Sequence, residues 1–187
     1  SFYIEYGDRR ILLDAGGISG AFAENAEKLG IPLDQVDCAV LSHAHYDHAD
    51  GMSTFFRKND HAKLYLRESC GENCYKRPDG KIKYIGIHRG FLDTFADRLV
   101  RVSGRYRLGD GIWLLPHTVS ADRLMKAGQQ ESMYLKVDDQ WITDCFAHEQ
   151  SLVFELPEGL VIFSSCSHAG ADLIISEVME AFPGKGI

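Results

Sequence analysis

Alternating hydrophobic and polar positions at the start of the chain predict two strands. Residues 2–6 and 10–13 alternate, and Gly7-Asp8 between them is a turn signal, so we expect a hairpin. Residues 36–41 are almost wholly apolar, which is typical of a short strand covered on both faces. Similar patterns predict further strands at residues 62–66, 98–102, 112–115, 133–137, 152–155 and 160–164.

Apolar side chains at helical spacing predict three helices. They occur at residues 20–29, 52–57 and 172–182, and Gly30 ends the first run. Residues 68–89 are polar, contain glycine and have no clear period, so a long loop is expected there. Strands outnumber helices and come in runs, which favours an α+β fold with mixed sheets and helices outside them.

Composition limits the class of protein. The chain has 187 residues, enough for one core, so residues 1–187 are expected to form a single domain. Hydrophobic residues make up 45% and charged residues 25%, which fits a folded protein and excludes a disordered one. No run of about 18 apolar residues and no signal-peptide pattern is present, so we expect a cytoplasmic protein without a membrane partner. A net charge of −7 without a Lys/Arg run argues against nucleic acid as a partner.

The five cysteines are odd in number and mostly scattered, which suits a reducing compartment better than a disulfide framework. Cys70 and Cys74 could be half of a zinc site or a redox pair. No second pair completes four ligands, so incidental loop cysteines are the favoured interpretation.

The stretch SHAHYDH at residues 42–48 directly follows the predicted strand at 36–41. His43 and His45 are two positions apart, so in an extended chain both rings point the same way and can meet one ion. Asp47 and His48 follow as the chain turns, and would face a second ion or the opposite side of the first. Imidazoles with a carboxylate suit zinc, with iron or manganese as substitutes. Two ions about 4 Å apart suit hydrolysis, because they hold a hydroxide and stabilise developing oxygen charge.

This motif, with Leu-Asp-Ala-Gly at residues 13–16 before it, resembles the metallo-beta-lactamase superfamily. Further stretches are similar to its dihydropterin ribofuranosylaminobenzene-phosphate synthase-like subgroup: SFYIEYGDRRILLDAG, FAENAEKLGI, LSHAHYDHADGM, FAHEQSLVF and GLVIFSSCSHAGADLI. The resemblance implies a four-layer αββα sandwich with the metals at one edge of its two sheets.

The resemblance also implies roles for individual residues. The implied ligands are His43, His45 and His148 for one ion, and Asp47, His48 and His168 for the other. Asp14 is expected to orient a ligand without binding metal, Cys166 to be a neighbour of His168, and Asp47 also to accept a proton during turnover.

Two departures from the superfamily pattern affect the second ion. Residues 165–168 read Ser-Cys-Ser-His where the superfamily places a bridging aspartate, and no histidine follows His168 to match its last ligand. The first strand of the subgroup also has no counterpart. The chain is therefore expected to be an internal piece of a longer protein, truncated at both ends.

The resulting hypothesis is a hydrolase with two zinc ions and a small-molecule substrate. Metal-activated water would attack a phosphate ester or another ester or amide, and the subgroup's name suggests a pterin-related compound. Two alternatives stay open: a metal-binding or sensor module without turnover, and a di-iron redox protein. The segments at His88-Arg89 and His117 are expected either to rim the active-site cleft or to be plain surface.

Overall fold

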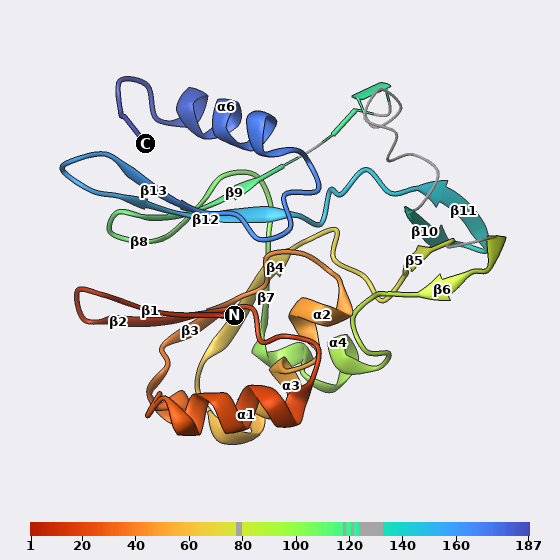
Figure 1. Cartoon of the computed structure of the whole chain (residues 1–187), viewed down its shortest axis with the longest axis horizontal. Coiled ribbons are helices and arrows are strands. Elements are labelled where there is room, and N and C mark those ends of the chain that lie inside the picture. The colour runs from red at the N-terminus through yellow and green to blue at the C-terminus, as the bar shows by residue number, and fades with distance from the viewer. Residues whose placement is uncertain (78–79, 118, 121, 124–132) are drawn as a thin grey trace.

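The computed structural model describes residues 1–77, 80–117, 119–120, 122–123 and 133–187. Two sheets lie face to face, and helices cover the outer face of each (Figure 1). The first sheet has the order β1 (Phe2–Tyr6), β2 (Arg9–Leu13), β3 (Cys38–Val40), β4 (Lys63–Arg67) and β7 (Leu99–Val102). The second has the order β13 (Leu160–Phe163), β12 (Gln150–Glu155), β9 (Ile112–Pro116) and β8 (Tyr106–Gly109).

A third, small sheet lies beside the sandwich, at the right of Figure 1. Its order is β11 (Gln140–Thr143), β10 (Met133–Val137), β5 (Cys74–Lys76) and β6 (Lys83–Tyr84). The helices within the described residues include α1 (Ser19–Lys28), α2 (Tyr46–Ala49), α3 (Met52–Lys58), α4 (Phe91–Thr94) and α6 (Ala171–Ala181), with 3-10 turns η1 (Leu33–Gln35) and η3 (Ala96–Arg98). Helices α1 and α3 lie outside the first sheet and α6 outside the second, so the predicted αββα sandwich is confirmed.

Alternation along the central strands creates the layers. In β2, Ile11 and Leu13 pack into the core between the two sheets, whereas Leu12 packs toward the helices. In β12, Leu152 faces the core between the sheets and Val153 packs toward α6. Since successive side chains of a strand point to opposite faces, these strands are buried on both sides and hold the two sheets against their helices.

The strand directions bring several loops to one edge of the sandwich. Strands β2, β3 and β4 are parallel, so the loops after β2 and β3 leave the sheet at the same edge. Strand β12 begins at this edge, where its Gln150 N–H donates to Ser42 O at 2.8 Å and its side chain Nε2 donates to Leu41 O at 2.8 Å. These bonds join the second sheet to the loop that carries the histidine motif.

The strands and helices expected from the sequence are present within a few residues of their predicted limits. The segment at residues 68–89 was predicted to be a loop but contains β5 and β6, and β8, β11, α2 and α4 were not predicted. Strands β5 and β6 have three and two residues, too few to show a period, and β5 pairs with the distant β10. Among the described helices, none is long and apolar enough to cross a membrane.

Gly51, between α2 and α3, allows a close approach that positions the motif. A Cβ atom on it would lie 2.1 Å from the carbonyl oxygen of Ala15, and its N–H donates to Gly16 O at 3.0 Å. We expect Gly51→Ala to lower the free energy of unfolding by about 1–3 kcal/mol, because the loop after β2 must shift. Urea unfolding measures this loss.

The matched control is Gly20→Ala in α1, where a Cβ atom meets nothing within 4 Å. This variant should keep its stability, because alanine suits a helix better than glycine. An equal loss in both variants would contradict the proposed close contact.

Candidate metal centre

The histidine motif leaves β3 as an extended chain and ends in the short helix α2. His45 keeps extended backbone angles, with φ −100° and ψ 146°, and directly precedes that helix. The Tyr46 N–H donates to Ile85 O at 2.9 Å, which ties the motif to the segment after β6. His43 and His45 are both buried, and their ring centroids are 4.6 Å apart.

Three histidines form what we call the open histidine group: His43, His45 and His168. Each offers one ring nitrogen, and these atoms lie within 4.8 Å of one another. Nε2 of each ring is buried and has no hydrogen-bond partner among the described residues. Burial, followed by the neighbouring imidazoles, lowers the pKa of His45 to about 3 and also lowers the pKa of His43. Neutral imidazoles with unpartnered nitrogens are the form in which histidine binds a divalent ion.

The carboxylate of Asp14 forms hydrogen bonds with residues of the motif. Its Oδ1 accepts from the Ser42 N–H at 2.8 Å, and its Oδ2 accepts from Ser42 Oγ at 2.8 Å and from Ser165 Oγ at 2.7 Å. Oδ2 also lies 2.8 Å from Nδ1 of His48. Burial alone would lower the pKa of His48, but the hydrogen bond and charge of Asp14 outweigh it and raise that pKa.

These bonds determine which ring nitrogens remain free. Ser42 Oγ donates its one proton to Asp14, so at its 2.8 Å contact with Nδ1 of His43 it can only accept. His43 therefore carries its proton on Nδ1, and its Nε2 is bare. By the same reasoning, His48 donates from Nδ1 to Asp14. The other ring nitrogen of His48, Nε2, lies 3.2 Å from Sγ of Cys166. His43, His48 and Cys166 form a second set whose ligand atoms lie within 4.8 Å of one another.

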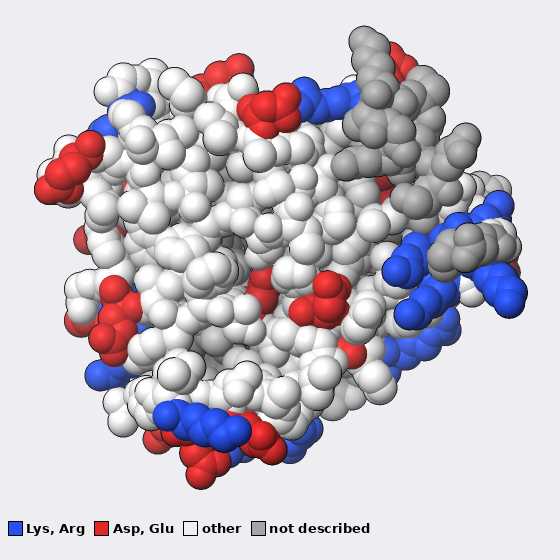
Figure 2. All heavy atoms as spheres, in the orientation of Figure 1, with Lys and Arg blue, Asp and Glu red and all other residues white. Residues whose placement is uncertain are grey.

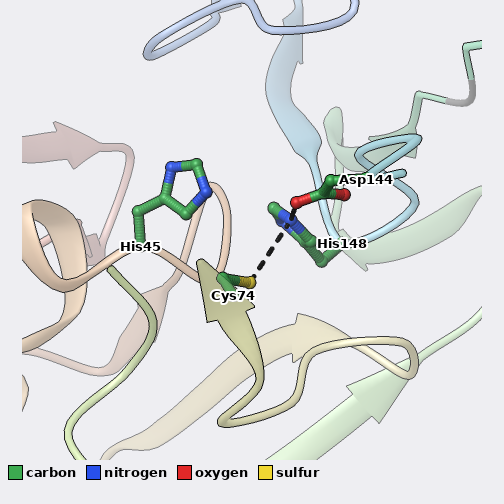
Figure 3. A group of neighbouring side chains, drawn as sticks. All are labelled: His45, Cys74, Asp144 and His148. Atoms are coloured by element: carbon green, nitrogen blue, oxygen red, sulfur yellow. Dashed lines mark hydrogen bonds and ion pairs between the residues drawn. The ribbon is translucent and has the colours of Figure 1, made fainter. Parts of the chain in front are cut away.

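A third group, which we call the mixed group, consists of His45, Cys74, Asp144 and His148 (Figure 3). All four side chains are buried. Cys74 Sγ lies 3.7 Å from Nε2 of His148, and Asp144 Oδ2 lies 3.1 Å from the same nitrogen. Burial raises the pKa of the Cys74 thiol well above its usual value. It would also raise the pKa of Asp144, but the hydrogen bond and charge of His148 outweigh it and lower that pKa.

The structure brings most of the candidate residues together, with two differences from the expected arrangement. His168 is grouped with His43 and His45, while His148 is grouped with Cys74 and Asp144. Asp47 lies at the rim, with its side chain 54% exposed and its carboxylate 3.7 Å from Nε2 of His48. Asp47 is in none of the three groups formed by the described residues.

Sequence reasoning missed Cys74 and Asp144. Cys74 was expected to lie in a loop, but it is the first residue of β5 and is fully buried, with Sγ 3.7 Å from Nε2 of His148. The one signal in the sequence that could have pointed to Asp144 is its position, four residues before His148.

His117 was also misplaced: it is fully buried, with Nδ1 2.6 Å from Glu177 Oε2 and Nε2 2.7 Å from Ser151 Oγ. Since Ser151 is equally buried, this network joins β9, β12 and α6 and offers no surface to a substrate.

Comparisons with known proteins agree on the fold. Residues 1–150 match the family model of the metallo-beta-lactamase superfamily. The chain is 23% identical over 188 aligned residues to 7,8-dihydropterin-6-methyl-4-(beta-D-ribofuranosyl)-aminobenzene-5'-phosphate synthase of Methanocaldococcus jannaschii, covering 96% of this chain and 62% of that protein. It is 33% identical over 105 residues to an uncharacterised protein of the same organism, covering 52% of this chain and 40% of the relative.

Solved structures are similar as well. A metal-dependent hydrolase of the beta-lactamase superfamily has a TM-score of 0.73 and 26% identity, covering 92% of this chain and 62% of that one. An N-acyl homoserine lactone hydrolase with product at its metal centre has a TM-score of 0.57, with 14% identity, 96% of this chain covered and 75% of that one, which shows the fold alone. The chain thus spans 62% of the length of both the synthase and the metal-dependent hydrolase.

Asp14→Asn tests the support behind the motif. An amide cannot accept all the hydrogen bonds that the carboxylate accepts, so we expect the free energy of unfolding to fall by about 1.5–3 kcal/mol. Zinc affinity should fall by about 10–100-fold, because His48 loses the partner that fixes its ring. Urea unfolding and a zinc competition titration measure the two effects. Asp60→Asn, at a fully exposed carboxylate, is the control, and undiminished zinc affinity in folded Asp14→Asn would rule out the orienting role.

Proposed function

Because this chain belongs to the metallo-beta-lactamase superfamily, we propose that it is a metal-dependent hydrolase. The open histidine group carries the proposal. Three buried ring nitrogens lack partners among the described residues, and leaving them so is costly unless an ion binds there. A bound zinc ion would supply a Lewis acid and lower the pKa of a water molecule, the two requirements of hydrolysis.

We assign two ions, with zinc favoured and iron or manganese as alternatives. His43, His45 and His148 serve one ion, and His48 and His168 serve the other, with Asp47 at its edge. The support is that His43 shares a ligand group with His45 and His45 shares another with His148, while His48 and His168 each share a group with His43. Asp14 and Ser42 fix the tautomers of His43 and His48, so that both present Nε2 to the ions.

Asp47 is proposed to accept a proton during turnover. Its carboxylate is half exposed beside His48, so it can reach a bound substrate and exchange protons with solvent. Asp14 is an unsuitable acceptor, because its oxygens already accept four hydrogen bonds and it is 2% exposed. General acid–base assistance of this kind contributes about 10²–10⁴-fold to a rate.

The charge beside the motif favours an anionic substrate, with a phosphate ester as the first candidate. A pocket of about 420 Å³ beside α2 has two cationic side chains and one carboxylate in its lining, which consists of Tyr46, Asp50, Lys83, Tyr84, Gly86, His88 and Arg89. Figure 2 shows Lys and Arg side chains gathered at the right, where Figure 1 places the small sheet. This basic side contrasts with the net charge of −7 for the whole chain and would attract an anion. The archaeal synthase's name adds a pterin-containing phosphate compound as a second candidate.

The test is hydrolysis of a phosphodiester, a lactone and a beta-lactam, together with elemental analysis, before and after His45→Ala. We expect bound zinc, turnover that is fastest on the phosphodiester, and loss of zinc and turnover in His45→Ala. His61→Ala is the matched control, because that histidine is half exposed and its ion-pair partner is the fully exposed Asp60. Metal with no mutation-sensitive turnover would favour a binding or sensor module. Two irons with oxygen-dependent chemistry would favour a redox protein.

Asp47→Asn separates proton transfer from metal binding. As a proton acceptor at the rim, Asp47 should contribute to kcat, so we expect kcat to fall by about 10²–10⁴-fold while zinc content stays unchanged. Steady-state kinetics and elemental analysis give the two quantities. Loss of one zinc per chain would identify Asp47 as a ligand, and an unchanged kcat would exclude it from the reaction.

A further inference from the structure

We propose that the outward face of the small sheet binds a small aromatic compound that carries a phosphate group. That this compound is the substrate rests on the metal-dependent hydrolysis proposed above, whereas its binding can be measured without turnover. We call this surface the aromatic face, and its side chains are Tyr75, Tyr84, Tyr134, Trp141, Arg77 and Arg89.

The alternation of side chains along β5 directs the tyrosine rings away from the sandwich. Cys74 is buried, and Leu135, its partner on β10, packs against the same hydrophobic core. Tyr75 follows Cys74 and is paired with Tyr134 of β10 and with Tyr84 of β6. Because paired residues of antiparallel strands point to one side of a sheet, the three tyrosines share the face opposite the core.

Trp141 of β11 joins these rings. It is paired with Lys136, two residues after Tyr134, so it points to the same side of the sheet. The ring centroid of Tyr75 lies 4.9 Å from that of Trp141 and 5.1 Å from that of Tyr84, both in edge-to-face contact. Trp141 is 39% exposed. Aromatic rings gathered on a surface of this kind mark a binding site more often than a plain exterior.

Two guanidinium groups lie on the tyrosine rings. The guanidinium carbon of Arg77 is 5.2 Å from the ring centroid of Tyr134, and that of Arg89 is 4.7 Å from the ring centroid of Tyr84. Arg89 also donates from Nη2 to the Tyr75 hydroxyl at 2.7 Å. Arginine held in this way offers a planar cation on which a second aromatic ring can stack and N–H groups that match the geometry of a phosphate.

The carboxylates around the aromatic face have other partners. Asp139 forms an ion pair with Lys136 at 2.7 Å. The two oxygens of Glu72 accept from the backbone N–H groups of Gly90 and Leu92 at 2.6 and 2.8 Å. Within the described part of the chain, neither arginine of the face forms an ion pair with a carboxylate. Both cations are therefore available to an external anion, which is the charge complementarity that a phosphate provides.

The size of the aromatic face favours a small compound. The three tyrosines occupy neighbouring strands, so their row is about 10 Å long. Single-stranded nucleic acids are usually bound over several nucleotides by a longer basic groove. The net charge of −7 for the whole chain also opposes binding of a polyanion.

The aromatic face adjoins the metal centre through the pocket beside α2. Tyr84 and Arg89 belong to the face and also line this pocket, together with Tyr46, which lies between His45 and Asp47 in the motif. A compound anchored on the face could therefore extend through the pocket toward the ions. In this arrangement the face holds the part of the substrate that does not react, and its binding energy positions the ester for attack.

Calorimetric titration of the zinc-loaded full chain tests the binding. The ligands are 1-naphthylmethylphosphonate, methylphosphonate and 1-naphthylmethanol, which offer ring and anion together, the anion alone and the ring alone. The P–C bond of the phosphonates resists hydrolysis, so binding is measured without turnover. We expect the aryl phosphonate to bind at least tenfold more tightly than either of the other two.

Two variants assign this affinity to the aromatic face. Trp141→Leu should weaken binding of the aryl phosphonate at least fivefold and leave methylphosphonate unchanged, and Arg89→Gln should weaken the aryl phosphonate at least tenfold. Arg107→Gln is the matched control, because Arg107 is an exposed arginine near the Trp113 ring on the second large sheet. It should change neither affinity. With an aryl phosphodiester as substrate, both face variants should raise KM and leave kcat unchanged.

His45→Ala separates the aromatic face from the ions. This variant is expected to lose zinc, yet it should bind the aryl phosphonate within threefold of the wild type. Equal affinity for the two phosphonates, or an aryl phosphonate affinity unchanged in both face variants, would overturn the binding surface and leave the hydrolase proposal intact. Tighter binding of a single-stranded oligonucleotide would overturn the small compound as ligand, and an unchanged KM would overturn its identity as substrate. A chain that binds the aryl phosphonate as expected but hydrolyses nothing would overturn the hydrolase proposal alone.

Discussion

The arrangement at the site edge depends on one buried carboxylate. Asp14 follows β2, and its oxygens accept from the loop after β3 at Ser42 and His48 and from the segment after β13 at Ser165. Burying a charge is costly, and these four bonds offset that cost only if all three segments are in place. Asp14 itself has φ +58°, a left-handed conformation that aspartate tolerates better than most residues. One side chain therefore links the two sheets and also fixes the tautomers of two histidines.

The small sheet differs from the two large sheets, which Asp14 links through buried hydrogen bonds. Its strands are short and its outer side is basic. Its contacts with the sandwich include the bridge between His45 and Gly86, the hydrogen bond from Tyr46 N–H to Ile85 O, and the packing of Cys74 and Leu135 against the core. In the proposed arrangement, this sheet supplies the charge that attracts a substrate. The sandwich supplies histidines in fixed orientations. The division of work between a rigid scaffold and an added edge element is common in enzymes.

The features that the sequence predicted correctly are those carried by local patterns. The alternation at β2 and β12, the helical stripe of α6 and the dense motif at residues 42–48 are all visible within short windows. The proximity of Cys74 and Asp144 was not predicted, because it depends on the pairing of β5 with β10, which lies some sixty residues later in the chain. His117 looked like a surface residue because its partners, Ser151 and Glu177, lie 34 and 60 residues later in the chain. Partners that only the tertiary fold brings together leave no periodic signal in one sequence.

Three consecutive buried residues that lead into β12 serve three different parts of the site. The His148 ring contacts Asp144, Glu149 accepts from the backbone N–H groups of His168 and Ala169 at 2.9 and 2.8 Å, and Gln150 bonds the loop after β3. Because the three residues are adjacent in the chain, an insertion or deletion here would displace all three contacts at once. A change of length is therefore expected to be costly in this stretch and better tolerated in the turn at residues 156–159 between β12 and β13.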